Sequence, residues 1–165
     1  GSAFQYADDR LKRDREVVLE AVKSDGSALK YALTRNREVV LEAVKSHGSA
    51  LEYADRLYLE DWVRLDRRLT GDREVVLQAV KTYGNALLYA DDRLKRDHEV
   101  VLEAMKSDGS AFQYADDRLK RDREVVLQAV KSNGNALLYA DDRLKRDREV
   151  VLEAVKSKGS AFQYA

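Results

Sequence analysis

The sequence lacks several features that would place it in common protein classes. It contains no cysteine, so disulfide bonds and thiolate chemistry are excluded. Thirty basic and thirty acidic residues cancel, and the two signs are interspersed along the chain. Nucleic acids and anionic membranes bind a face of one sign, so neither is expected as a ligand. No apolar run approaches the roughly 18 residues of a membrane span, and no signal peptide opens the chain. We therefore expect no membrane insertion and favour an intracellular location.

What the sequence does contain is a repeat. The most frequent step between copies is 25 residues, with three residues missing after Ala32 and eleven added between Ala54 and Asp72. A fixed period of this length is typical of tandem arrays. The phrase REVVL, or HEVVL in one copy, begins at Arg15, Arg37, Arg73, His98, Arg123 and Arg148. We predict one array over residues 1–165, with an insert at 55–71 and units that start near residues 14, 36, 72, 97, 122 and 147.

Each unit predicts two short helices. In the first unit Asp14 is placed to cap the first helix, and Gly26 to end it as a left-handed residue. Ser27 would then cap the second helix, which continues through ALKYA or ALLYADDRL. Val17, Val18 and the apolar residues that follow cover an arc of roughly 200°, which suits a helix covered by neighbours on both sides. The expected fold is all-α, an α-solenoid of six two-helix units.

The unit resembles a known family of tandem repeats. The matching letters are DxE at the start, then VVLxAVK, the glycine and ALxYA. That family consists of short two-helix repeats and is catalogued only as a domain of unknown function. The resemblance covers almost the whole chain outside residues 55–71. It implies a helical array, and it brings no reaction, cofactor or catalytic residue.

The insert, residues 55–71, contains the only tryptophan of the chain. Apolar residues keep a three-or-four spacing from the preceding helix through the insert, which predicts one long helix from about Ala50 to Leu69. Two interpretations stay open. Trp62 packs on a neighbouring helix and fills the gap that the irregular linker leaves. Alternatively, the insert protrudes as an arm that presents Tyr58 and Trp62 as a contact hot spot.

Residues suited to catalysis or metal binding occur only in unfavourable patterns. His98 replaces an arginine at an exposed helix start, and His47 occupies a variable position, so neither predicts acid–base catalysis. Adjacent aspartates such as Asp91 and Asp92 point about 100° apart on a helix. A basic residue, Lys95 or Arg96, follows each of them four residues later in the sequence. We interpret them as solvated ion pairs rather than metal ligands. No enzyme activity, cofactor or metal is expected.

Two rows of positions vary between otherwise constant units. The residue before each unit glycine differs in charge, size and aromatic character, reading Asp25, His47, Tyr83, Asp108, Asn133 and Lys158. A recognition ridge and neutral drift at a turn both explain this row. The second row lies about 100° from the buried stripe of the second helix and reads Lys30, Glu52, Leu88, Gln113, Leu138 and Gln163. Leu88 and Leu138 are therefore predicted to be exposed apolar residues.

One tyrosine per unit lies at the edge of the predicted buried stripe: Tyr6, Tyr31, Tyr53, Tyr89, Tyr114, Tyr139 and Tyr164. A packed ring with its hydroxyl reaching water or a carbonyl is favoured over base stacking, because the chain has no basic stripe for phosphates.

The leading hypothesis is a non-enzymatic interaction module or scaffold that binds a protein partner through the turn between the helices, the second row and the insert. The alternative is a spacer or assembly element that stacks end to end within a larger complex, and RNA binding is less favoured. The candidate partner-binding residues are Asp25, His47, Tyr83, Asp108, Asn133, Lys158, Leu88, Leu138, Tyr58 and Trp62.

Overall fold

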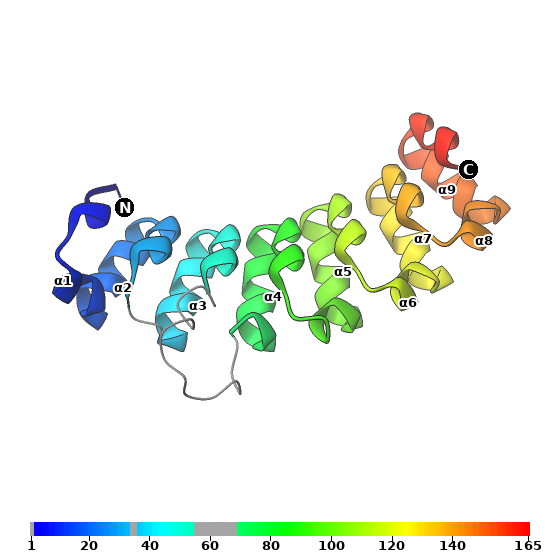
Figure 1. Ribbon diagram of the computed structural model, residues 1–165. Coiled ribbons are helices and arrows are strands. Elements are labelled where there is room, and N and C mark those ends of the chain that lie inside the picture. Colours follow the sequence, from blue (N-terminus) through cyan, green and yellow to red (C-terminus); the bar gives the residue numbers. More distant parts are fainter. Residues whose placement is uncertain (1, 34–35, 55–68) are drawn as a thin grey trace.

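The structure of the protein is a computed structural model that describes residues 2–33, 36–54 and 69–165. Within these ranges the chain forms helices joined by short turns and contains no β-strand. The helices lie side by side, in chain order, along one elongated body with the two termini at opposite ends (Figure 1). The predicted all-α fold is confirmed.

Among the described residues, six α-helices of ten residues form the first row of the array. An aspartate or asparagine side chain caps the start of each one, as the sequence predicted for Asp14. The Oδ1 atom of Asp14 accepts hydrogen bonds from the backbone N–H groups of Glu16 and Val17 at 2.9 and 3.1 Å. These bonds satisfy N–H groups that have no partner within the first turn of a helix. The helices are α2 (Arg15–Ser24), α3 (Arg37–Ser46), α4 (Arg73–Thr82), α5 (His98–Ser107), α7 (Arg123–Ser132) and α9 (Arg148–Ser157).

The second helix of each unit is a 3-10 helix that begins at the unit glycine. Gly26 is the first residue of η2 and does not adopt the predicted left-handed conformation. The preceding residue, Asp25, is extended and caps η2 by accepting from Ser27 N, so Ser27 is not the cap. These two expectations were wrong. These second helices are η2 (Gly26–Tyr31), η3 (Gly48–Tyr53), η5 (Gly84–Tyr89), η7 (Gly109–Tyr114), η8 (Gly134–Tyr139) and η9 (Gly159–Tyr164), and a similar 3-10 helix, η1 (Ser2–Tyr6), precedes the first unit.

The expected continuation of the second helix through ALLYADDRL was also wrong. In the two ALLYADDRL copies the chain is extended at Ala90 and Ala140, as it is at Ala115 in the copy between them, and a separate short helix follows each of these alanines. A hydrogen bond between units explains the break, because the backbone N–H of Asp116 donates to Lys95 O at 3.0 Å. Asp141 N donates to Lys120 O in the same way, also at 3.0 Å. The short helices are α1 (Asp9–Arg13), η4 (Leu69–Gly71), η6 (Leu94–Arg96), α6 (Asp117–Lys120) and α8 (Asp142–Lys145).

One continuous hydrophobic core runs through the array. Successive α-helices pack against each other, and the 3-10 helices form a second row that contacts them. Both valines of the VV pair are fully buried in the inner helices, as Val75 and Val76 are in α4. The next residue, Leu77, is partly buried. The broad apolar arc thus faces a neighbouring helix on each side, as predicted.

The unit glycines allow neighbouring units to approach closely. A Cβ atom on Gly134 would lie 2.3 Å from the carbonyl oxygen of Ala154 and 3.0 Å from the Cβ atom of Lys158, both in the next unit. No side chain fits at such distances. Glycine is therefore required here for the approach of two backbones rather than for an unusual backbone conformation.

The predicted long helix across the insert is not tested over most of its length, because residues 55–68 lie outside the described residues. At its two described ends the chain is 3-10 helical: Ala50 lies within η3, and Leu69 begins η4. Asp72 then caps α4 through Glu74 N and Val75 N, at 3.0 and 3.2 Å.

Candidate interaction surfaces

The variable residue before each glycine forms a row along one edge of the array, which we call the turn row. Each member lies between an α-helix and the 3-10 helix that follows it, and each member from His47 onward lies against the glycine of the preceding unit. A Cβ on Gly48 would be 2.8 Å from the Cβ of Tyr83, and one on Gly84 would be 2.9 Å from the Cβ of Asp108. The row is therefore continuous from unit to unit. Its members are Asp25, His47, Tyr83, Asp108, Asn133 and Lys158.

Half of the turn row has a capping role. The side chains of Asp25, Asp108 and Asn133 each accept a hydrogen bond from the backbone N–H two residues on, at 2.9 to 3.0 Å. Such a bond stabilises the start of the 3-10 helix, and it accounts for aspartate and asparagine without any ligand. In the first of these, the bonds with Ser27 also lower the pKa of the Asp25 carboxyl.

The other half of the turn row makes no capping bond and is exposed. These residues are His47, Tyr83 and Lys158, and 43% of the Tyr83 surface is accessible to solvent. The Nδ1 atom of His47 accepts a hydrogen bond of 3.2 Å from Gly26 N of the preceding unit. A tyrosine exposed on an otherwise polar edge is unexplained by helix capping, and this makes it the strongest recognition candidate of the row.

Polar side chains also link neighbouring turns. Asn85 Nδ2 donates to Asp108 Oδ2 at 2.8 Å, and Ser110 Oγ donates to Asn85 Oδ1 at 3.3 Å. In the following pair of units Lys158 replaces the aspartate, and Asn135 Oδ1 is buried with no hydrogen-bond partner among the described residues. A change in the turn row thus also changes the contact between two units.

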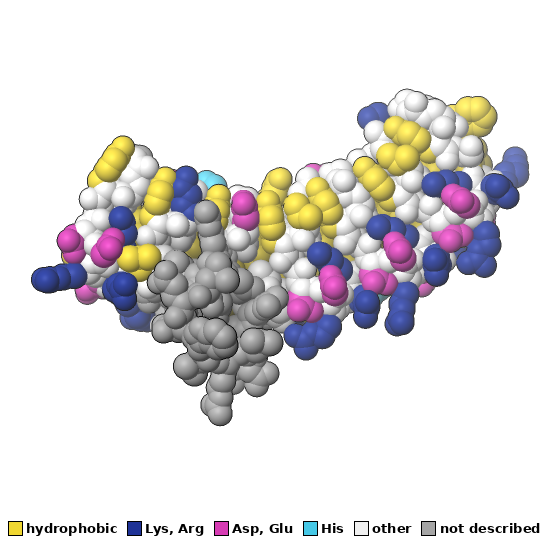
Figure 2. Space-filling model, in the orientation of Figure 1, with side chains coloured by type: hydrophobic (Ala, Val, Ile, Leu, Met, Phe, Trp, Pro, Cys, Tyr) yellow, Lys and Arg dark blue, Asp and Glu magenta, His cyan; other side chains and the backbone are white. Residues whose placement is uncertain are grey.

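The second variable row, which we call the leucine row, lies on the 3-10 helices. Leu88 and Leu138 expose 44% and 42% of their surface, which confirms the prediction made for both. Lys30, Glu52 and Gln163 of this row are also exposed. Hydrophobic side chains can be followed along this side of the array in Figure 2. Leu88 and Leu138 are thus large apolar side chains at positions that are polar in the other units, and they have no role in the core.

Most of the tyrosines lie partly buried beside the leucine row and pack against the core. The hydroxyl of Tyr31 donates to Gln5 Oε1 of the preceding unit at 2.9 Å. Burial of the ring, together with the carboxylate of Glu52, raises the pKa of Tyr89. Tyr31 and Tyr89 therefore each lie near a residue of the preceding unit, Gln5 and Glu52 respectively.

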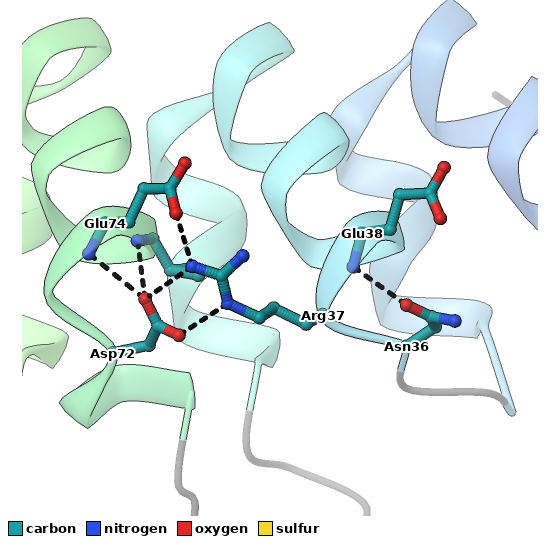
Figure 3. A network of polar contacts seen from close by, with 6 residues as sticks. Asn36, Arg37, Glu38, Asp72 and Glu74 are labelled. Carbon is teal, nitrogen blue, oxygen red and sulfur yellow. Dashed lines mark hydrogen bonds and ion pairs between the residues drawn. The ribbon is translucent and has the colours of Figure 1, made fainter.

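At the opposite end of the α-helices, arginines join neighbouring units. Figure 3 shows Arg37 of α3 beside Asp72, which caps α4, and Glu74 of α4; the Nε atom of Arg37 lies 2.6 Å from Asp72 Oδ2. Arg73 contacts Asp97 and Glu99 in the same way, and Arg123 contacts Asp147 and Glu149. We did not predict this network from the sequence, although the constant arginine after the capping residue was a signal for it. Because each of these arginines faces carboxylates, they form no free basic stripe.

The aspartate pairs have structural roles that differ from the simple ion pairs expected. The first aspartate of a pair caps the short helix, as Asp116 does for Arg118 N at 3.0 Å, and accepts from Arg96 Nε at 2.9 Å. The second pairs with a lysine three residues on, as Asp117 does with Lys120 at 3.6 Å. In the described ranges, no group of three or more His, Asp or Glu side chains is arranged to hold a metal ion.

Two of the candidate residues, Tyr58 and Trp62, lie outside the described residues. The other eight are placed on the turn row and the leucine row. None of the helices within the described ranges combines the length and apolar character needed to cross a membrane.

The repeated capped helix, the 3-10 helix and the close glycine contact define a protein built as a tandem helical array. The chain matches the family described as a domain of unknown function (DUF4116) over residues 1–35, 72–120 and 122–165. These segments make up more than half of the sequence, and the chain belongs to this family. No curated protein and no solved structure matches the chain.

Proposed function

We propose that this protein is a non-enzymatic interaction module that binds a protein partner along the turn row and the leucine row. The observation that carries the proposal is the exposure of Leu88 and Leu138 in an array whose other variable positions are mostly polar. Both side chains are large and apolar, and neither contributes to the buried core. Because the two leucines occupy the same position in different units, they can serve as two anchor points of one extended contact along the array.

Constant and variable positions are distributed in the way that a binding array requires. The buried valine pairs, the capping residues and the unit glycines hold the units together, and they scarcely change between copies. Residues such as Tyr83 differ from copy to copy on the exposed edge. A repeat protein can therefore vary its contact residues without altering the stacking of its units.

A protein partner suits this surface better than a nucleic acid. The inter-unit arginines are held by carboxylates, so phosphates would have to displace existing ion pairs. Leu88 and Leu138 stand two units apart and offer two separate apolar anchor points. A partner with two apolar side chains at matching spacing, within a polar surround, would contact both.

The experiment is affinity capture from the source lysate with variants that copy residues found elsewhere in the array. The first variant is Leu88→Gln with Leu138→Gln, since Gln113 and Gln163 occupy the same row. We expect a defined protein to be retained by the natural chain and lost by this variant, with no effect of nuclease. Arg118→Gln, an exposed position on the short helix α6 and outside both rows, is the matched control and should retain the protein.

The turn row is tested separately. His47→Asn, Tyr83→Asn and Lys158→Asn introduce the residue that already caps a helix at Asn133, so folding is preserved. Loss of the partner in this triple variant places recognition in the turn row as well. Equal retention by every variant would refute the proposed surface, and loss of the partner on nuclease treatment would favour RNA binding instead.

A further inference from the structure

One junction between units lacks the arginine contact that joins the others. Within the described ranges, arginines link four of the five pairs of successive ten-residue α-helices. Figure 3 shows one such contact, in which a single guanidinium group faces two carboxylates of the next unit. The exception is the junction between α5 and α7. Helix α5 starts at His98, whose side chain forms no hydrogen bond or ion pair with any described residue.

The carboxylates that an arginine would meet at this junction are present. Asp122 caps α7, and neither Asp122 nor Glu124 forms an ion pair with a described residue. At the next junction the equivalent carboxylates, those of Asp147 and Glu149, both contact Arg123. A histidine side chain is shorter than that of arginine and has no forked guanidinium group, so it does not replace such a double contact. The junction between α5 and α7 therefore lacks the arginine alone.

The backbone packing at this junction also differs from that of the other junctions. Elsewhere a Cβ atom on the unit glycine would lie closest to a carbonyl oxygen of the next α-helix, as one on Gly84 would lie 2.4 Å from Ala104 O. On Gly109 the Cβ atom would instead lie closest to Asn133 Cβ, at 2.4 Å, and no carbonyl oxygen of α7 is among its three nearest atoms. Helix α7 is therefore shifted relative to η7, compared with the equivalent pairs of helices.

The short helices are also held less closely at this junction. Arg96 Nε lies 2.9 Å from Asp116 Oδ2 at the junction before it, whereas Arg121 Nε lies 3.4 Å from Asp141 Oδ2 here. A surface cavity of about 250 Å³ lies between the same two units, and Arg121, Asp141 and Tyr139 line it. In Figure 1 the helices α2 to α5 form a nearly straight row, and the helices from α7 onward turn away from that row. The array thus bends where the arginine contact is missing.

Helix α5 also differs from the other ten-residue helices in its core. Met105 is the only methionine of the chain, and it stands where the other copies carry valine. Its side chain is almost fully buried, and its carbonyl oxygen accepts a hydrogen bond of 3.0 Å from Ser132 Oγ of the next unit. An unbranched, flexible side chain fills a gap of changing shape better than a valine does. The core can therefore stay filled while the two units move.

We propose that the junction between α5 and α7 is an adjustable joint, at which the array changes its curvature. The segment before the joint ends with α6, and the segment after it begins with α7. Leu88 lies on η5, before the joint, and Leu138 lies on η8, after it. Movement at the joint therefore changes the separation of the two leucines, and with it the spacing of apolar side chains that a partner must present. This consequence for binding rests on the proposed function, whereas the joint itself does not.

Distances between pairs of spin labels test the joint in the full chain, which has no natural cysteine that would also be labelled. Labels attached through Lys81→Cys and Lys131→Cys span two units and cross the joint. The matched pair, Lys45→Cys and Lys106→Cys, spans two units from the same positions of the helices and does not cross it. All four lysines are exposed. We expect the distance distribution of the first pair to be broader than that of the matched pair, and equal widths would overturn the proposal.

Exchanging the residue at the start of the α-helix tests the cause of the difference. His98→Arg supplies the missing guanidinium group beside Asp122 and Glu124, so it should narrow the distribution of the pair that crosses the joint. Because the new ion pairs are exposed, Tm should rise by only about 1–3 °C. Arg73→His is the reverse change at a junction that has the arginine contact, and it should broaden the distribution of the matched pair. If neither variant changed the widths, the missing arginine would not be the origin of a joint.

The joint and the proposed function can fail separately. The label distances are measured on the free chain, so they remain valid if no partner binds the leucine row. Equal widths of the two pairs would remove the joint, but they would not affect capture of a partner by Leu88 and Leu138. When a captured partner is bound, the pair that crosses the joint should give one narrow distribution, because the partner selects one separation of the leucines. A width that the bound partner leaves unchanged would overturn the coupling of the joint to binding.

Discussion

Replacing Gly109 by alanine would place a Cβ atom where the next unit already stands. That atom would lie 2.4 Å from Asn133 Cβ, 3.2 Å from Asn133 N and 3.2 Å from Ser132 Oγ. Two carbon atoms without a bond normally approach to about 3.5 Å, so the two units would have to move apart by roughly 1 Å. Because both carbon atoms are fixed to their backbones, rotation of a side chain cannot relieve the contact.

The expected cost of Gly109→Ala is about 2 kcal/mol in the free energy of unfolding, the usual range for inserting one carbon atom into a packed interior. In a chain of this length, that corresponds to a fall in Tm of about 4–8 °C. Gly159→Ala is the matched control. Its flanking sequence is nearly the same, but its Cβ would meet nothing within 4 Å. Without a clash, alanine should stabilise by about 0.4–1 kcal/mol, because it restricts the unfolded chain.

Thermal and urea unfolding followed by circular dichroism would measure both variants. We expect opposite signs for two substitutions whose local sequences are nearly identical. If Gly109→Ala were as stable as Gly159→Ala, then the glycine would not be needed for the approach of the units. If both variants were destabilised equally, a local conformational requirement would be the explanation instead.

Two further predictions concern the caps. The hydrogen bond from Arg37 is the main cause of the lowered pKa of Asp72. The ionised Asp72 therefore stabilises the folded chain above the unfolded pKa of about 3.9, and this stabilisation is lost as the pH falls through the folded pKa. Asp72→Asn keeps a cap, as Asn36 does in α3, and should therefore lose less stability than the natural chain in acid; an unchanged pH profile would contradict this. At the turns, Asn133→Ala should lower the free energy of unfolding by about 1 kcal/mol, whereas Lys158→Ala should have little effect because Lys158 makes no capping bond; equal Tm values for these two variants would count against the capping role.

Several elements of the fold could be predicted because they depend on local chemistry. An aspartate before a glutamate and an apolar run predicts a capped α-helix, and Asp14 does cap α2. The broad apolar arc predicted a helix covered on two sides, and Val75 and Val76 are buried as expected. The exposure of Leu88 also followed from its angle to the buried stripe. These features need only the periodicity of one unit.

Other features could not be read from one unit, because they arise between units. The second helix of this unit, η7, ends at Tyr114 because the chain then leads Asp116 N to a carbonyl oxygen of the preceding unit. The glycine pattern suggested a helix end in the left-handed conformation, but Gly134 is required by the position of the Ala154 carbonyl. The arginine network, in which Arg37 contacts Asp72 across an insert, depends equally on the placement of units.

By itself, the sequence determined the period, the caps, the buried stripe and the positions free to vary, since each is set by residues within a few turns of one another. Only the tertiary structure decided how each unit closes on the next. It divided the turn row into capping residues such as Asn133 and exposed residues such as Tyr83. The physical reason is that a stacking contact joins atoms about 25 residues apart in the chain, where local periodicity carries no information on distance.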